Sequence, residues 1–193
     1  GYEGSWLRRP GLPAGALPTG ALPAGILPPE LTGAEETGAP RGGGGDREVR
    51  LPDGSYFKGQ FLGNRMHGFG KFVWASGGGY EGQFDNDKMH GEGAYCWGDG
   101  SRYNGQWVGN SMGPRGTMAW TDGGKYTGEF RDGLKHGDGE LWWPDGRSYR
   151  GQWDSGAQHG VGYVVNKDGV RRKSQWDNGK MTRWLEEGAA TGH

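Results

Sequence analysis

Four histidines recur at one position of a 23-residue period, which is a pattern to test first for metal binding: His67, His90, His136 and His159. If the repeating unit is a β-hairpin, equivalent side chains of neighbouring units lie about 9.6 Å apart, because two strands separate them. Histidines that share one zinc ion must each reach it within about 2.1 Å. The spacing therefore excludes a shared metal, and we expect these histidines to hydrogen-bond the backbone near a turn.

The other residue types that support catalysis lack suitable partners. Cys96 stands beside Trp97 without an activating base, which favours a buried or partly buried thiol over a nucleophile. The aspartates at 99, 122, 145 and 168 each precede a glycine, a pairing that turn chemistry explains better than general acid–base catalysis. The glycines at 42–45 are not followed by Lys and Ser or Thr, so they do not match a phosphate-binding loop. We therefore expect no enzyme activity, no cofactor, no metal and no small-molecule substrate.

Glycine and aromatic residues are both abundant, and together they narrow the fold class. The 193 residues include 44 Gly, 10 Trp, 8 Tyr and 6 Phe. Disordered chains are poor in aromatic residues, so this pairing indicates a β-rich fold. The net charge of −1 argues against a protein that holds nucleic acid by bulk electrostatics, and no run of 18 apolar residues exists to cross a membrane. One cysteine fits a reducing compartment.

Residues 7–47 form a low-complexity segment of different composition. Seven of the ten prolines lie in the first 50 positions, and a leucine precedes a proline every five residues, at 12, 17, 22 and 27. Proline fixes φ and removes a donor, and glycine loosens the chain, so we expect neither a helix nor a central strand. The segment is either a solvated linker or an extended arm whose leucines anchor it along a neighbouring surface.

From residue 57 onward the chain repeats with a period of 23. Each unit opens with an aromatic residue: Phe57, Tyr80, Tyr103, Tyr126 and Tyr149. Glycine follows two residues later, and a second aromatic four residues later: Phe61, Phe84, Trp107, Phe130 and Trp153. Then come His-Gly, a further glycine, and a closing Asp-Gly, with Gly113-Pro114 as the one departure from His-Gly. Five units in unbroken register indicate a repeat architecture.

Alternation within the unit predicts a β-hairpin. In residues 80–84 the aromatic and glycine positions share one face of a strand, and polar residues occupy the other. A second strand at 93–97 ends in a recurring tryptophan: Trp74, Trp97, Trp120 and Trp143. Asp-Gly then supplies the positive φ of a tight turn. A glycine between two aromatics leaves room for a cross-strand ring. We predict an all-β, elongated, single-layer solenoid of stacked antiparallel hairpins.

The pattern Tyr-x-Gly-x-Trp/Phe, a turn, His-Gly-x-Gly and Asp-Gly resembles the MORN repeat (membrane occupation and recognition nexus), most closely at 80–100 and 126–146. The resemblance divides the chain into the start of an N-terminal unit at 1–6, the insertion at 7–47, an array at 48–180 and a C-terminal cap or tail at 181–193. Units open at 57, 80, 103, 126 and 149, and a partial one opens at 172. The N-terminal unit is expected to extend before residue 1. A short helix over 181–187 is expected to cap the last hairpin.

A thin sheet with aromatics on both faces cannot bury all of them, so some are expected to contact a partner. The candidates form two ladders that line a groove for a helix or an extended peptide: Phe61, Phe84, Trp107, Phe130 and Trp153, and Trp74, Trp97, Trp120 and Trp143. About half of these rings are instead expected to pack against glycines of adjacent hairpins.

The resemblance implies a non-enzymatic scaffold that docks proteins of a large assembly. MORN proteins of similar make-up occur in ciliary and flagellar axonemes, including radial-spoke heads, which implies a cytoplasmic, cytoskeletal location. Two alternatives are a phospholipid or membrane-contact module, as in junctophilins, and the repeat region of a larger enzyme. Only residues 171–173 form a basic cluster near the repeats, whereas lipid recognition generally uses 4–8 Lys or Arg, so membrane binding is disfavoured.

Overall fold

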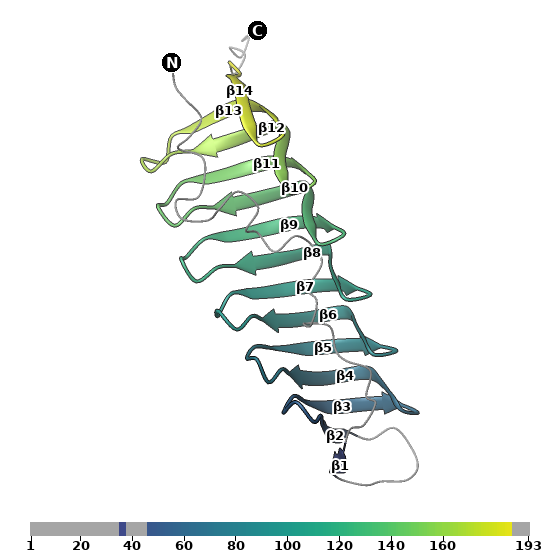
Figure 1. Ribbon diagram of the computed structural model, residues 1–193. Helices are drawn as coiled ribbons and strands as arrows, with labels where there is room; N and C mark the ends of the chain where they lie inside the picture. Colours follow the sequence, from purple (N-terminus) through teal and green to yellow (C-terminus); the bar gives the residue numbers. More distant parts are fainter. Residues whose placement is uncertain (1–34, 38–45, 187–193) are drawn as a thin grey trace.

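The computed structural model describes residues 35–37 and 46–186, and these residues form one antiparallel sheet of 14 strands (Figure 1). Each strand is hydrogen-bonded to the strands next to it in the sequence. The described residues contain no helix, and therefore no helix that could cross a bilayer. The sheet is a single layer, elongated in the direction in which the strands stack, and the predicted all-β hairpin solenoid is confirmed.

The strands alternate in length: across most of the array, each unit consists of a seven-residue strand followed by a nine-residue strand. In chain order they are β1 (Glu35–Thr37), β2 (Arg47–Arg50), β3 (Tyr56–Leu62), β4 (Arg65–Val73), β5 (Gly79–Asp85), β6 (Lys88–Cys96), β7 (Arg102–Val108), β8 (Ser111–Ala119), β9 (Lys125–Arg131), β10 (Leu134–Trp142), β11 (Ser148–Asp154), β12 (Ala157–Val165), β13 (Arg171–Asp177) and β14 (Lys180–Trp184). β5 extends one residue beyond the predicted strand at 80–84 at each end, whereas β6 begins five residues before the predicted strand at 93–97 and ends one residue short of it.

Two-residue turns close the hairpins along one long edge of the sheet. Between β5 and β6, Asn86 and Asp87 have φ values of 48° and 67°. Positive φ at both positions is the signature of a type I′ turn, whose twist matches that of the flanking strands, and Asn, Asp and Gly adopt it most readily. The same combination recurs at residues 109–110, 132–133, 155–156 and 178–179.

The Asp-Gly pairs form the turns along the opposite edge, as predicted. The Asp99 carboxylate accepts a hydrogen bond from the backbone N–H of Ser101 at 2.8 Å, and Gly100 has φ of 90°. Asp53, Asp122 and Asp145 accept equivalent backbone bonds from the residue two positions later. Each of these four carboxylates thus holds a turn.

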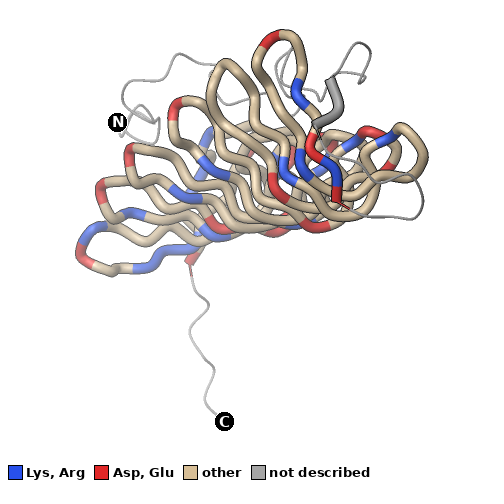
Figure 2. Tube along the Cα trace, turned by 90° about the horizontal axis from the view of Figure 1, so that it is seen from below, with Lys and Arg blue, Asp and Glu red and all other residues tan. Residues whose placement is uncertain are grey.

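The pairing register places the recurring aromatics of both strands on one face. In the β5–β6 hairpin, Tyr80 pairs with Tyr95 and Gly82 with Gly93. We call this side the aromatic face and the other side, on which Glu81 pairs with Ala94, the polar face. Both predicted ladders therefore lie on the same face of the sheet. Because the sheet is curved across its strands (Figure 2), rings from neighbouring strands pack on one another and bury themselves without a second layer.

The two ends of the array differ from expectation in different ways. The segment expected to be a helix instead contains strand β14, which pairs with β13 and continues the sheet. The reason is local: Asn178 and Gly179 form a type I′ turn, which directs the chain back along β13. At the other end, the predicted N-terminal unit at 1–6 and most of the insertion at 7–47 lie outside the described residues. Within the insertion, β1 pairs with β2 at the edge of the sheet.

Candidate protein-interaction face

A tyrosine ring lies over two facing glycines in each of the four units that open with tyrosine. In the second unit, a Cβ on Gly93 would overlap the Tyr80 ring, and one on Gly82 would stand 2.7 Å from the Tyr80 hydroxyl oxygen. Only glycine leaves space for the ring at both positions. The same arrangement recurs for Tyr103 over Gly105 and Gly116, Tyr126 over Gly128 and Gly139, and Tyr149 over Gly151 and Gly162. The predicted role of the glycines in admitting a ring is confirmed.

The tyrosine hydroxyl ends on a backbone carbonyl of its own unit. Tyr80 donates to the carbonyl oxygen of Gln83 at 2.8 Å, and Tyr126 donates to that of Glu129 at 2.9 Å. Burial away from water raises the pKa of both hydroxyls well above the usual value for tyrosine. The hydroxyls therefore stay protonated and remain donors over the whole physiological pH range.

Edge-to-face ring contacts connect each unit to the next. The Tyr80 ring lies 5.0 Å from Phe84 in its own unit and 5.4 Å from Trp107 in the following unit, measured between centroids. Such contacts contribute about 0.5–1.5 kcal/mol each beyond the burial of area. The contact between units recurs for Tyr103 with Phe130, Tyr126 with Trp153 and Tyr149 with Trp176. The rings thus form one continuous ladder that spans the array.

The nine residues predicted to line a groove are all on the aromatic face, but most of them are core. Six are buried, with 1–7% of their surface exposed: Phe84, Trp107, Phe130, Trp153, Trp74 and Trp143. Three are only partly buried against that core: Phe61, Trp97 and Trp120. Partner binding by the nine residues stays a prediction. Phe61, Trp97 and Trp120 are the most accessible of the nine.

One lysine interrupts the buried methionines of the aromatic face. Lys135 occupies the repeat position that Met66, Met89 and Met112 hold in earlier units. Its ammonium nitrogen lies 4.7 Å from the centroid of the Trp153 ring, close enough for a cation–π attraction. Next to it is an apolar hollow whose lining includes Met112, Met118, Trp120 and Leu134. This hollow brings a partly exposed tryptophan and a cation together.

Side chains in the type I′ turns bond to the preceding unit, a role that the sequence reasoning missed. The carboxylate of Asp87 accepts from the backbone N–H of Met66 at 2.7 Å, and the amide oxygen of Asn110 accepts from that of Met89 at 2.8 Å. In the later units a glycine takes this position, and only its backbone N–H bonds back: Gly133, Gly156 and Gly179. The recurring turn pair was visible in the sequence, but its partner one unit away was not.

A recurring glutamine forms a second contact that the sequence reasoning missed. The side-chain oxygen of Gln83 accepts from the backbone N–H of Glu92 at 2.7 Å, across the irregular part of the hairpin. Gln60 and Gln152 make the same bond in their units. Glutamine follows the unit-opening aromatic by three residues in most units, and this recurrence in the sequence indicates that the side chain has a structural role.

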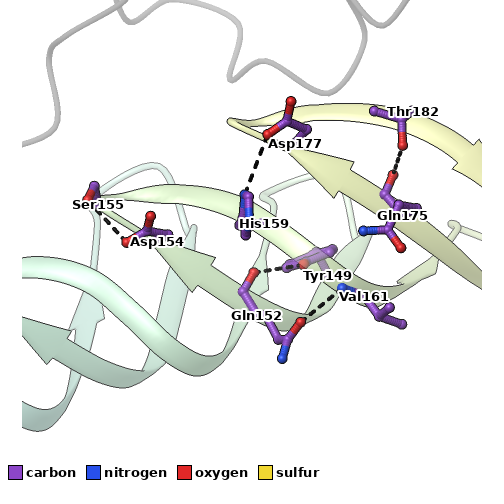
Figure 3. A network of polar contacts seen from close by, with 9 residues as sticks. All are labelled: Tyr149, Gln152, Asp154, Ser155, His159, Val161, Gln175, Asp177 and Thr182. Carbon is purple, nitrogen blue, oxygen red and sulfur yellow. Dashed lines mark hydrogen bonds and ion pairs between the residues drawn. The ribbon is translucent and has the colours of Figure 1, made fainter.

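The recurring histidines lie on strands, and three of the four face a carboxylate of the next unit rather than holding backbone near a turn; for His90 the equivalent residue is Val108. Nδ1 of His136 is 3.2 Å from Asp154, and Nδ1 of His67 is 3.4 Å from Asp85. A third such contact joins His159 to Asp177, as Figure 3 shows together with the Tyr149–Gln152 bond. Among the described residues, no three His, Cys, Asp or Glu side chains are grouped so as to hold a metal ion.

The family model described as "MORN repeat" matches residues 57–79, 80–102, 103–125, 126–146 and 149–171, more than half of the chain. The chain belongs to the MORN-repeat family. The five matched MORN repeats correspond to the hairpins whose glycine and ring geometry is described above. Repeats of this family are generally non-catalytic scaffold modules.

The partial unit after the fifth MORN repeat shows what happens when the unit-opening aromatic is absent. Arg172 takes the place of the tyrosine, and Ser174 replaces the glycine beneath it, paired with Gly162. The Ser174 hydroxyl donates to the Gly162 carbonyl oxygen and accepts from Trp176 Nε1 at 2.7 Å. Where no ring needs the space, a small polar side chain fills it.

The remaining comparisons give no named relative of similar sequence. No curated protein matches the chain. One solved structure that is similar to the MORN array is the SAS-4 (dCPAP) TCP domain of Drosophila melanogaster in complex with a proline-rich motif of Ana2 (dSTIL). It is 12% identical with a TM-score of 0.43, and the match covers 79% of this chain and 90% of that one.

Proposed function

We propose that this MORN array is a non-enzymatic scaffold that docks partner proteins on its aromatic face. The observation that carries the proposal is the division of the nine ladder residues: six complete the core, while Phe61, Trp97 and Trp120 keep part of their surface free of it. Partly exposed aromatic rings beside an apolar hollow are the features of a protein-docking surface.

The shape of the array supports a scaffold. The sheet is long and one layer thick (Figure 1), so successive units offer a series of similar surfaces along one direction. A helix or an extended peptide that lies across several units would contact partly exposed rings of more than one unit. The proposed partners are therefore proteins that present an elongated apolar stripe.

We further propose that the assembly is a ciliary or flagellar axonemal complex, such as the radial spoke, and that the protein is cytoskeletal. The support for this is the make-up of the chain, which resembles that of axonemal MORN proteins. Localisation of the tagged protein in ciliated cells, by light microscopy and by fractionation of axonemes, tests it. A tagged protein that is absent from isolated axonemes would contradict the placement.

The docking proposal is tested by comparing two double variants of the full chain as baits. Trp97→Ala/Trp120→Ala removes partly exposed rings from the aromatic face, whereas Tyr56→Ala/Phe69→Ala removes rings from the polar face. Proteins of the source cell that co-purify with the parent chain are identified by mass spectrometry. We expect their recovery to fall with the first variant and to persist with the second.

Thermal unfolding of both variants separates docking from folding. If the first variant loses its partners only in proportion to a large fall in Tm, Trp97 and Trp120 belong to the fold and the docking proposal is wrong. The membrane alternative is tested by flotation with phosphatidylserine vesicles. Salt-sensitive binding of the parent chain to those vesicles would favour that alternative over a protein scaffold.

A further inference from the structure

Charge is unevenly distributed between the edges and the polar face of the sheet. Several loop tips carry a carboxylate, and Lys and Arg recur along the strands together with some Asp and Glu (Figure 2). From β8 to β14, the polar-face positions include those that flank the glycine row and the row of paired residues that runs from Lys125 through Ser148 to Arg171. Together these two sets carry six cations and three carboxylates. The cations are Arg115, Lys125, Arg150, Arg171, Lys173 and Arg183, and the carboxylates are Glu129, Asp138 and Glu140. This half of the polar face is basic although the net charge of the chain is −1.

The basic half of the polar face is also hollow. A furrow of about 910 Å³ crosses it from β8 to β13, with glycine backbone in its floor. Three arginines line it from separate strands: Arg150, Arg171 and Arg115, whose guanidinium also contacts the Glu129 carboxylate at 2.6 Å. Two rings outside the repeat pattern, Trp142 and Tyr163, line the furrow as well.

The rings hold two cations in place. The guanidinium carbon of Arg171 lies 3.7 Å from the centroid of Tyr163, and the ammonium nitrogen of Lys125 lies 4.2 Å from that of Trp142. A guanidinium that stacks on a ring is fixed in orientation, while its N–H groups remain directed outward in the plane of the fork. Such a group is pre-organised to receive a carboxylate with two parallel hydrogen bonds.

We propose that this furrow binds an extended, acidic segment of a partner protein. The site lies on the face opposite to the docking surface proposed above, so either proposal can fail without the other. The arginines would pair with Asp or Glu side chains, and the two rings would cover apolar parts of the same segment.

The strand spacing sets the pattern of the ligand. Arg115 on β8 and Arg150 on β11 are three strands apart and on opposite sides of the glycine row, which separates their backbones by about 16 Å. Arg171 on β13 is two strands further and two residues further along the strands, about 12 Å. An extended chain advances about 3.3 Å per residue, so the furrow selects Asp or Glu at about positions i, i+5 and i+8.

Two other anionic partners fit the furrow less well. Asp138 and Glu140 also line the furrow, and their carboxylates repel the continuous phosphate backbone of a nucleic acid. A peptide can place neutral residues opposite these carboxylates and acidic residues opposite the arginines. A membrane surface is flat, so the cations that bind it must project from the protein. The cations of the furrow instead lie within it and against aromatic rings. A peptide is the partner whose width and charge spacing match.

The test uses the full chain and a fluorescein-labelled peptide of about twelve residues, with Glu at about positions i, i+5 and i+8 in a Gly/Ser background. A second peptide carries Gln at those three positions. Binding is measured by fluorescence anisotropy at about 50 mM and about 200 mM salt, and in parallel by flotation with phosphatidylserine vesicles. Arg150→Glu/Arg171→Glu reverses two charges in the furrow, and the matched control Lys58→Glu/Arg65→Glu reverses two exposed charges at the other end of the array.

We expect the Glu peptide to bind the parent chain, more weakly at the higher salt concentration, and the Gln peptide to bind at least about tenfold more weakly. Arg150→Glu/Arg171→Glu should raise the Kd of the Glu peptide about tenfold or more, while the control leaves it within about twofold. Equal loss in both variants, equal binding of both peptides, no binding of the Glu peptide, or binding to vesicles alone would each overturn the proposal. Circular dichroism of both variants establishes that they are folded.

Discussion

The indole nitrogen of Trp107 donates a hydrogen bond to the backbone carbonyl oxygen of Gly93, in the preceding repeat, over a distance of 3.2 Å. Trp153 makes the equivalent bond to Gly139, also at 3.2 Å. The second aromatic of a unit therefore both packs on the ring ladder and bonds to the backbone of its neighbour. In the first, second and fourth units this position is phenylalanine, which keeps the packing without the bond.

This bond makes Trp107 a position at which packing and hydrogen bonding can be separated. Trp107→Phe should lower the free energy of unfolding by about 1–2 kcal/mol, because the Gly93 carbonyl loses a donor. Trp107→Ala should cost about 3–5 kcal/mol, because the ring contacts on both sides are lost as well. Urea denaturation of the two variants measures the difference. A Trp107→Phe variant as stable as the parent chain would show that the bond to Gly93 contributes nothing beyond the ring.

The glycine under the tyrosine ring should tolerate no side chain. In Gly93→Ala the new methyl group would overlap the Tyr80 ring, so we expect a loss of about 1–3 kcal/mol in the free energy of unfolding. Gly98→Ala is the matched control, since a Cβ there meets no described atom closer than 3.5 Å and the backbone is not left-handed. If both variants unfold at the same urea concentration, ring contact does not explain why glycine recurs.

Alkaline pH should destabilise the array, because the pKa of its buried tyrosines is higher in the folded chain than in the unfolded chain. Burial raises the pKa of five hydroxyls above the ordinary value of 10.0: those of Tyr80, Tyr95, Tyr103, Tyr126 and Tyr149. Below pH 10 the folded and unfolded chains hold the same tyrosine protons, so this contribution to stability is fully present. Above pH 10 the unfolded chain releases protons that the folded chain retains, so stability falls as the pH rises.

Urea midpoints at a series of pH values from 8 to about 11.5 measure this dependence. Tyr126→Phe should show a shallower decline above pH 10, because one raised pKa is removed while the ring remains. Phe57 shows that phenylalanine fits the unit-opening position, where it is fully buried. A midpoint that stays constant up to pH 11.5 would contradict the assignment.

The last hairpin should be open to stabilisation through its turn. Gly179 has φ of 77°, close to the 72° of Asn110, but it has no side chain to bond to the preceding unit. In Gly179→Asn the amide oxygen should accept from the backbone N–H of Gln158, as Asn110 does from Met89. We expect a gain of about 0.5–1.5 kcal/mol, measured by urea denaturation and by slower amide exchange in β14. Gly179→Ala, which has no acceptor and a strained φ, should instead destabilise the hairpin.

Sequence periodicity was sufficient for the hairpin but not for the relation between its two strands. The alternation around Tyr80 shows which residues share a face of β5, and the same holds for Tyr95 in β6. Whether those two faces coincide depends on the number of turn residues and on the register shift between Gly82 and Phe84. Neither is encoded in the alternation itself, so a groove of exposed rings was predicted where most of the rings form a core.

The contacts between units were beyond prediction for a related reason. The Asp87 side chain bonds to Met66, 21 residues earlier, and His136 faces Asp154 in the next unit. A repeat shows that such positions are equivalent, but not which pairs of positions meet when the units stack. The composition of residues 181–187 does not predict the C-terminal strand, because that strand depends on the turn at Asn178 and Gly179, which keeps the chain in the sheet.

Strands that pair strictly in chain order give the array a particular response to force. Every strand between β2 and β13 pairs through its backbone only with its two sequence neighbours, and the ring contacts described above reach no further than the adjoining unit. Tension applied at the two ends of the chain then reaches the terminal strands first and peels the sheet strand by strand, hairpin after hairpin. A rod of this kind yields in small steps and can lengthen under load while its remaining units stay folded.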